Sequence, residues 1–289
     1  MSKNSIRAAF EADRLFHAMA AHNPLSARLA EEAGFNGIWA SGFEASAAAG
    51  VPDASIISLD HHLQMTRAMA SAVAIPVIAD IDTGYGNAIN VMHVVREYHR
   101  AGAAAVVMED KHFPKDTSLL AGGRQELVSI EQFVGKIQAA KATVADKEFL
   151  LLARTEALIA GQGQDEALKR ASAYEKAGAD AIVVHSKSRT PDEVIKFVEA
   201  WNGGVPIVLI PTAYPDLTEA MIAKLKKVGI VIYGNHCVRA MVTALQDVFG
   251  QIRADGGIHN VDKKIVSVER IFELQNVAKM KESEKKYLR

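Results

Sequence analysis

The stretch Arg100-Ala-Gly-Ala-Ala-Ala-Val-Val-Met-Glu109 decides the fold. It predicts a helix that ends at Gly102, since glycine accepts the left-handed conformation of a helix C-cap, and then a short apolar strand that stops at a carboxylate. The pattern returns in residues 32–41 and 176–185, and in every copy a polar residue follows the glycine by seven positions. A looser copy covers residues 227–235, with Gly229 as its glycine.

Continuous apolar strands that alternate with helices indicate parallel strands buried on both faces. Eight such strands and their helices predict an α/β fold of the (β/α)8 barrel type, as one domain over residues 1–289 that includes C-terminal helices from about residue 240. The alternative is an open doubly wound sheet, but no Gly-x-Gly-x-x-Gly turn follows the first strand, which argues against dinucleotide binding. The predicted strands lie near Leu15–Ala18, Ile38–Ser41, Pro76–Asp80, Ala104–Glu109, Phe149–Arg154, Ala181–His185, Pro206–Ile210 and Val231–Tyr233.

Composition, net charge and cysteine count limit the classes of protein to which this chain can belong. The 289 residues are 49% apolar, enough for one large core. A formal net charge of −1 gives no reason to expect nucleic-acid binding. The lone Cys237 excludes an internal disulfide and fits a reducing compartment. Since no apolar run approaches the ~20 residues needed to span a bilayer, we expect a cytoplasmic protein without a membrane partner.

Polar residues gather at the predicted C-terminal ends of the strands, where barrels of this type carry their active sites. Three carboxylates brought to one mouth would repel each other unless a cation lay between them, and oxygen ligands favour Mg²⁺ or Mn²⁺ over Zn²⁺. Alternatively, Asp80 and Asp82 cap the next helix or hold the glycine turn after them. The strand-end residues are Ser41, Asp80, Asp82, Glu109, Arg154, His185 and Asn235.

Two of these residues have competing interpretations. Arg154 could clamp a carboxylate or phosphonate through two parallel hydrogen bonds, or form an ion pair with Glu156 or a metal-site carboxylate. His185 could donate to a substrate oxygen, act as an acid–base group, or be structural. Cys237, beside His236, could suggest nucleophilic catalysis, although a buried thiol is the preferred interpretation.

The loop after Glu109 reads Asp110-Lys-His-Phe-Pro-Lys-Asp-Thr-Ser118. Its charged and hydroxyl side chains, on Lys115, Thr117 and Ser118, suit a loop that closes over a bound anion and excludes water. A solvated surface loop is the alternative.

Two motifs carry a resemblance to a known family. Asp80-x-Asp-Thr-Gly-Tyr-Gly86, followed by Glu109-Asp-Lys-x-Phe-Pro-Lys115, resembles the phosphoenolpyruvate mutase branch of the isocitrate lyase superfamily. The resemblance extends over nearly the whole chain, through residues 154–161, 165–170, 185–187, 234–236 and 264–268.

The resemblance implies an α-keto acid phosphonate as substrate, bound beside Mg²⁺, with Mn²⁺ or Co²⁺ as possible substitutes. It implies that the metal is served, partly through water, by Asp80, Asp82 and Glu109, with support from Asp53. It implies substrate contacts from Trp39, Ser41, Gly42, Ser118, Arg154, His185 and Asn235, with Ser41 and Gly42 acting through their backbone on the pyruvyl part. It implies catalytic roles for Lys115, Thr117, Arg154 and His185, with the loop residues near the phosphoryl group.

Departures from the family pattern select the reaction. Isocitrate and methylisocitrate lyases carry a catalytic cysteine in the matching loop, whereas residues 111–115 contain none. The mutases carry asparagine where this chain has Thr117, and the hydrolytic members carry threonine. Threonine is shorter and could leave room for water or orient it, and positioning dominates phosphoryl transfer. The resemblance therefore favours Mg²⁺-dependent hydrolysis of the C–P bond of phosphonopyruvate to pyruvate and phosphate.

Three other functions stay open at this point. The first is a phosphoenolpyruvate mutase, which isomerises the same compound, and the second is a related keto-acid C–C lyase or hydrolase. The third is a non-catalytic ligand-binding barrel.

Near the C-terminus, Val261–Leu274 carries a helical apolar stripe, and the tail Lys279–Arg289 is highly charged. The resemblance implies a late helix that packs on, or is swapped with, a neighbouring subunit in a homodimer or homotetramer. A helix that closes this subunit's own barrel is the alternative.

Overall fold

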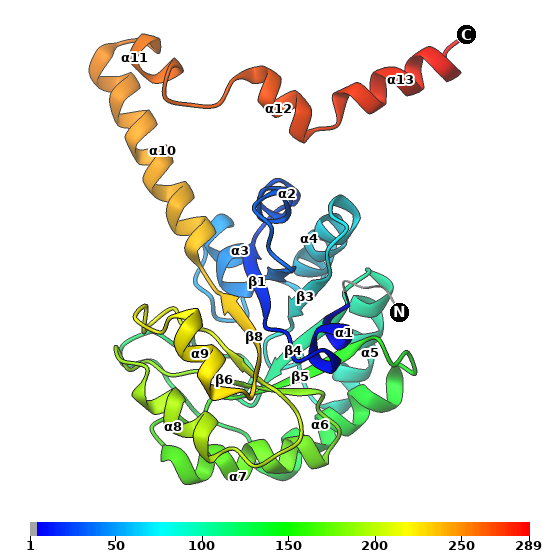
Figure 1. The fold of residues 1–289 in the computed structure, drawn as a ribbon, viewed down its shortest axis with the longest axis vertical. Helices are drawn as coiled ribbons and strands as arrows, with labels where there is room; N and C mark the ends of the chain where they lie inside the picture. Colours follow the sequence, from blue (N-terminus) through cyan, green and yellow to red (C-terminus); the bar gives the residue numbers. More distant parts are fainter. Residues whose placement is uncertain (1–4) are drawn as a thin grey trace. The chain divides into compact units, whose positions relative to one another are not determined.

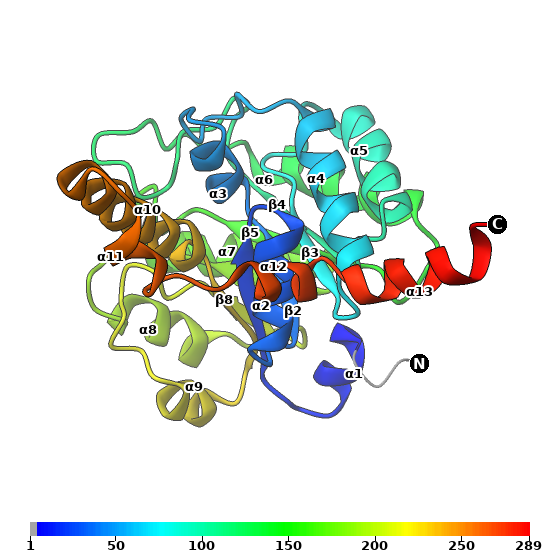
Figure 2. The same cartoon turned by 90° about the horizontal axis from the view of Figure 1, so that it is seen from above.

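The computed structural model describes residues 5–289, so the first four residues of the predicted domain 1–289 lie outside it. Eight parallel strands pair in chain order, and β1 closes the barrel by pairing with β8. The predicted (β/α)8 barrel is therefore confirmed, with the helices outside the strands (Figures 1 and 2). The strands are β1 (Phe16–Ala21), β2 (Gly37–Ala40), β3 (Val77–Asp80), β4 (Ala105–Glu109), β5 (Leu150–Thr155), β6 (Ala181–Val184), β7 (Ile207–Leu209) and β8 (Val228–Tyr233).

Capping residues set where many of the helices begin. The side chains of Asn23, Ser58, Asn87 and Ser129 each accept a hydrogen bond from a backbone N–H of the first helical turn. The helices of the barrel unit are α1 (Ile6–Glu11), α2 (Pro24–Glu32), α3 (Gly42–Ala48), α4 (Leu59–Ala72), α5 (Ala88–Arg100), α6 (Ile130–Thr143), α7 (Gly163–Lys176), α8 (Asp192–Ala200) and α9 (Glu219–Leu225).

The repeated glycine signal is confirmed in its three full copies and wrong in the looser one. Gly34, Gly102 and Gly178 follow α2, α5 and α7 with φ of 87°, 90° and 109°. After α9, however, Lys226 adopts the left-handed conformation with φ of 55°, and Gly229 lies inside β8. A Cβ at Gly229 would lie 2.8 Å from side-chain atoms of Phe10 and Pro206. That glycine is needed for close packing rather than for a helix end.

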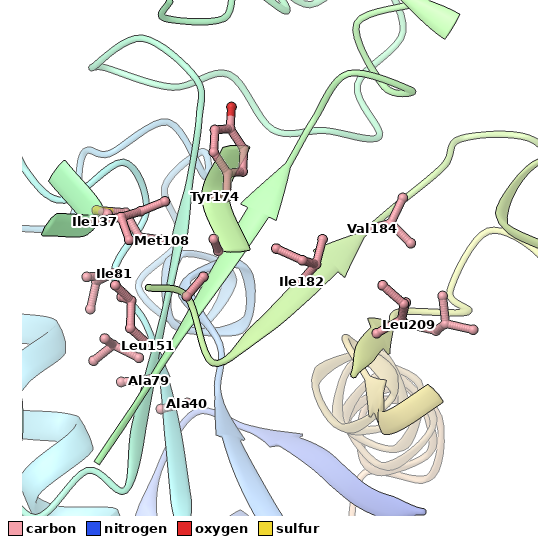
Figure 3. Packing of buried hydrophobic residues seen from close by; sticks show 14 of the residues in the cluster. Ala40, Ala79, Ile81, Met108, Ile137, Leu151, Tyr174, Ile182, Val184 and Leu209 are labelled. Atoms are coloured by element: carbon pink, nitrogen blue, oxygen red, sulfur yellow. The ribbon is translucent and has the colours of Figure 1, made fainter. Parts of the chain in front are cut away.

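The buried core forms two layers. One lies between the strands and the surrounding helices and includes Ile81, Met108 and Ile182, which Figure 3 shows. The other fills the barrel interior, with Ile78 and Val107 among its members. Side chains alternate between the two faces of a strand. A strand-end residue that lies two positions after an inward residue of this second layer therefore points into the mouth of the barrel.

The chain divides into two compact units, residues 1–237 and 238–289. The second unit holds most of α10 (His236–Asp255), together with α11 (His259–Asp262), α12 (Val268–Leu274) and α13 (Val277–Tyr287). The stripe Val261–Leu274 is interrupted between α11 and α12, so a single helix there was wrong. One domain over 1–289 stays a prediction. Among residues 5–289, no helix combines the length and apolar character needed to cross a membrane.

Candidate active site

Strand alternation aims four charged or polar side chains into the barrel mouth. Asp80 lies two residues after the interior residue Ile78, Glu109 two after Val107, Arg154 two after Leu152, and His185 two after Val183. Each therefore shares the inward face of its strand. Glu109 and Arg154 are also paired in register across β4 and β5. The predicted convergence of these strand-end residues is thus present in the structure.

A single cavity at this mouth unites most of the residues selected from the sequence. It is also lined by residues that the sequence did not single out, including Phe43, Leu119 and Thr212. Gly42 and Asp82 lie in an adjoining smaller cavity, which shares Asp53 and Asp80 with the first. The selected residues that line the main cavity are Trp39, Ser41, Asp53, Asp80, Lys115, Thr117, Ser118, Arg154, His185 and Asn235.

Two of the carboxylates expected to serve a metal, Asp82 and Asp53, form ion pairs with the Lys115 ammonium. Lys115 Nζ lies 2.7 Å from Asp82 Oδ1 and 3.2 Å from Asp53 Oδ1. Burial would raise the pKa of Asp82, but the neighbouring Lys115 outweighs it and lowers that pKa. Burial raises the pKa of Asp80 to about 6 and that of Glu109 to about 7, against the pull of nearby cations. Burial therefore makes these two carboxyl groups harder to ionise than in water, and a cation bound beside them would favour their charged form.

The count of charges and one buried carboxylate oxygen both fit a divalent cation. Glu109 Oε1 is buried and makes no hydrogen bond among the described residues, and its ion pair with Lys111 Nζ is long, at 4.0 Å. This oxygen can therefore serve as a ligand. The mouth has five carboxylates and three cationic groups, which leaves two negative charges when all are ionised. The carboxylates are Asp53, Asp80, Asp82, Glu109 and Glu156, and the cations are Lys111, Lys115 and Arg154.

Backbone donors hold Asp80 in place. Asp82 N–H donates to Asp80 Oδ1 at 3.1 Å, and Gly42 N–H donates to Asp80 Oδ2 at 3.4 Å. A Cβ on Gly42 would lie 3.2 Å from Asp80 Oδ2 and 3.3 Å from Asp82 Oδ1, so only glycine fits comfortably. The Gly42 N–H, which we expected to bind the pyruvyl group, is directed at a carboxylate in this structure.

Arg154 forms the ion pair with Glu156 that was one of its two interpretations, while the clamp on a substrate stays a prediction. It lines the cavity, yet its Nε donates to Glu156 Oε1 at 2.5 Å and lies 3.5 Å from Glu109 Oε2. Burial alone would raise the pKa of Glu156, but Arg154 and then Lys111 hold it well below its usual range. Glu156 is therefore ionised and fixes the guanidinium at the cavity wall.

His185 is a neutral group at the cavity wall. Burial, and then the nearby Arg154 guanidinium, lower its pKa to about 3. Its Nδ1 atom is buried and has no hydrogen-bond partner among the described residues. A neutral imidazole with a free ring nitrogen can form a hydrogen bond to a substrate without carrying charge.

The loop that follows β4 lies closed over the mouth. Lys111 Nζ donates to the Asp116 carbonyl at 2.9 Å and to Ser118 Oγ at 2.8 Å. Ser118 Oγ donates to Glu156 Oε2 at 2.6 Å and accepts from Arg154 Nη2 at 2.9 Å. One donor and two acceptor positions are all that a hydroxyl offers. The Ser118 hydroxyl is therefore fully used within the protein.

Sequence reasoning missed two residues of this network, Lys111 and Asp110, and named a third, Glu156, only as a possible ion-pair partner of Arg154. Lys111, only 1% exposed, lies in a quoted motif but received no role in the site. Asp110 accepts a hydrogen bond from Glu156 N at 2.9 Å, and its other oxygen accepts from Tyr174 at 2.6 Å and from Arg170 at 3.1 Å. The sequence offered one signal for Asp110, because this charged residue directly follows the strand-end carboxylate Glu109.

The family of the chain follows from comparison with known proteins. Residues 6–253 match the family model described as phosphoenolpyruvate phosphomutase. The chain belongs to the phosphoenolpyruvate phosphomutase family. It is 62% identical over 290 residues to phosphonopyruvate hydrolase of Variovorax sp. (strain Pal2), with all of both chains covered. The family resemblance drawn from the motifs is thereby confirmed, and the chain is an enzyme of this family.

One further relative and one solved structure represent the two activities in this part of the family. The phosphoenolpyruvate phosphomutase of Tetrahymena pyriformis is 44% identical over 270 residues, which cover 93% of this chain and 90% of that protein. The crystal structure of a phosphonopyruvate hydrolase complex with oxalate and Mg²⁺ superposes with a TM-score of 0.95 at 61% identity, covering 100% of both chains.

Proposed function

We propose that this family member is a Mg²⁺-dependent phosphonopyruvate hydrolase, which converts phosphonopyruvate and water to pyruvate and phosphate. The observation that carries the proposal is Thr117, which stands in the loop where the mutases carry asparagine. The full-length identity of 62% to a phosphonopyruvate hydrolase supports the same reaction.

The donor set at the mouth supports Mg²⁺ as the resident ion, with Mn²⁺ or Co²⁺ as substitutes. Oxygen atoms of Asp80, Asp82 and Glu109 would hold it, directly or through water, and Asp53 would support them. When bound, the ion would neutralise the charge that develops on the pyruvyl oxygens as the C–P bond breaks. Lys115, between Asp53 and Asp82, would then stand beside the phosphoryl group.

The pyruvyl group would lie against the wall formed by Trp39, Ser41 and Asn235, which line the same cavity as Arg154 and His185. Arg154 would present its fixed guanidinium to the substrate, while the neutral His185 forms a hydrogen bond. The structure supports modified roles for two of the expected residues. Gly42 would act by allowing close approach to Asp80, and Ser118 by holding the loop.

Thr117 is suited to position water. Its carbonyl accepts from Gln125 Nε2 at 3.2 Å and from Leu120 N at 3.3 Å, which fixes the backbone. Its half-buried hydroxyl has no protein partner in the described part of the chain, unlike that of Ser118. In hydrolysis the water oxygen bonds to phosphorus, and the C–P electron pair passes to the methylene carbon, which takes a proton to form the methyl group of pyruvate. The Thr117 hydroxyl would orient that water.

The test follows phosphonopyruvate by phosphorus NMR and pyruvate by proton NMR in the presence of Mg²⁺, with a chelator control. We expect inorganic phosphate and pyruvate in equal amounts, with loss of both on chelation. Thr117→Ser keeps the hydroxyl and should keep hydrolysis, whereas Thr117→Asn should lose hydrolysis and yield phosphoenolpyruvate. Conversion of phosphonopyruvate chiefly to phosphoenolpyruvate by the unchanged protein would overturn the proposal and make it a mutase.

A further inference from the structure

Three side chains outside the proposed mechanism converge beside the barrel mouth. His22 follows β1, Glu44 lies in the first turn of α3, and Cys237 lies at the start of α10. His22 Nδ1 is 3.0 Å from Glu44 Oε2 and 4.0 Å from Cys237 Sγ, and the three donor atoms all lie within 4.8 Å of one another. Glu44 is 0% exposed and His22 is 6% exposed. Glutamate is rarely buried so completely unless it is paired.

We propose that His22, Glu44 and Cys237 form a binding site for one Zn²⁺ ion. Nitrogen, carboxylate oxygen and thiolate sulfur are the three ligand types that Zn²⁺ takes in proteins, and three protein ligands leave a fourth position for water. Tetrahedral Zn²⁺ places such nitrogen and oxygen atoms about 3.3 Å apart, and nitrogen and sulfur atoms about 3.6 Å apart. The observed 3.0 Å and 4.0 Å separations need to change by only a few tenths of an ångström.

The chemistry of this cluster separates it from the carboxylates at the mouth. Mg²⁺ prefers oxygen ligands in an octahedral arrangement, whereas imidazole and thiolate select softer ions. Cys237 is half-buried rather than fully enclosed, which gives an ion a route in. The Cys237 sulfur and the Glu44 carboxylate raise the pKa of His22 to about 9, so an ion must displace a proton and will bind better in mildly alkaline solution.

The cluster also touches the wall of the substrate cavity. Glu44 N donates to Ser41 Oγ at 3.2 Å, and Ser41 Oγ donates to the Gly234 carbonyl at 3.5 Å. Ser41, Gly234 and Asn235 line the cavity, and Cys237 follows two residues after Asn235. An ion bound by Glu44 of α3 and Cys237 of α10 would therefore shift this wall of the substrate cavity. A consequent change in KM rests on the proposed function, but the binding of the ion does not.

Cobalt(II) is a suitable probe, because a thiolate bound to it gives an intense charge-transfer band in the near ultraviolet. The chain has a single cysteine, so any such band must come from Cys237. Metal-free protein would be saturated with Mg²⁺ and then titrated with Co²⁺. We expect a band that saturates at one equivalent, disappears in Cys237→Ser, and is displaced by Zn²⁺. His22→Gln and Glu44→Gln should each weaken Co²⁺ binding at least ~10-fold.

Two controls keep the result interpretable. Asp82→Asn alters only the oxygen-ligand site and should leave the band unchanged, so loss of hydrolysis and loss of this site can be told apart. Circular dichroism and melting curves would identify variants that fail to fold, and the two glutamine variants give independent evidence if Cys237→Ser does fail. Absence of the band in the unchanged protein would overturn the proposal. A band of equal affinity in His22→Gln and Glu44→Gln would overturn it as well.

Discussion

Replacing Ser118 with alanine should weaken the closed position of the loop 111–118 and leave the barrel folded. The hydroxyl makes three hydrogen bonds, to Glu156 at 2.6 Å, from Lys111 at 2.8 Å and from Arg154 at 2.9 Å. Hydrogen bonds to charged groups each contribute about 1.5–3 kcal/mol. After the substitution, Lys111 and Arg154 still contact Glu156, at 3.0 Å and 2.5 Å, so none of the charges loses its last partner. The net loss should therefore be about 2 kcal/mol rather than the full sum.

A loss of about 2 kcal/mol shifts the equilibrium between closed and open loop by ~30-fold. Because Lys115 and Thr117 belong to that loop, kcat/KM for phosphonopyruvate should fall roughly 10- to 30-fold. The free energy of unfolding should change by less than about 1 kcal/mol, because the loop opens locally before the barrel unfolds. Phosphate release measures the first quantity, and urea denaturation followed by circular dichroism measures the second.

Ser129→Ala is the matched control, since it removes a serine hydroxyl that lines neither cavity at the mouth. Ser129 Oγ accepts from Gln132 N at 3.2 Å and caps α6. Its loss should cost about 1 kcal/mol of unfolding free energy and leave kcat/KM unchanged. Wild-type kcat/KM in Ser118→Ala would refute the reasoning. So would a loss confined to the free energy of unfolding, because Ser118 would then only stabilise the fold.

Three further outcomes are expected. Tyr174→Phe removes the 2.6 Å hydrogen bond to Asp110 and should lower the free energy of unfolding by about 1.5–3 kcal/mol in urea, with unchanged kcat/KM; the opposite pattern would give Tyr174 a role in the reaction. Burial, and then Arg154, lower the pKa of His185 to about 3, so its imidazole stays neutral at higher pH. The pH profile of kcat/KM above about pH 5 should therefore have the same shape in the wild type and in His185→Gln, and an extra limb near pH 6.5 in the wild type alone would contradict this. The exposed Phe272 and Val268 of α12 are expected at a subunit interface; light scattering should find a homodimer or homotetramer, which Phe272→Glu should weaken, and a wild-type monomer would exclude it.

The barrel was predictable because local chemistry and the global fold agree in most repeats. Gly34, Gly102 and Gly178 each end a helix at a fixed distance from a strand end, so three strands and their polar termini could be located from spacing alone. The prediction failed at Gly229 because glycine has a second use. There it makes room for Phe10 and Pro206, and a lysine takes the left-handed position instead.

The site was predictable as a set of residues but less well as a set of contacts. Strand alternation explains why Asp80, Glu109 and Arg154 gather at the mouth. Which side chains then pair depends on long-range geometry that spacing does not contain. The Ser118 hydroxyl contacts Glu156, 38 residues further along the chain, and this contact uses a group that was expected to meet the substrate.

The fixed distance from glycine to strand end has a consequence for which mutations the chain can tolerate. Substitutions between Gly102 and Glu109 change packing, but one inserted or deleted residue would turn Glu109 from the interior of the mouth to the outside of the barrel. In a closed barrel β4 pairs with both β3 and β5, so it cannot slip to absorb the change without breaking two ladders. Length variation among homologous chains should therefore concentrate in the connections between these repeats, while the repeats themselves vary in residue identity at constant length.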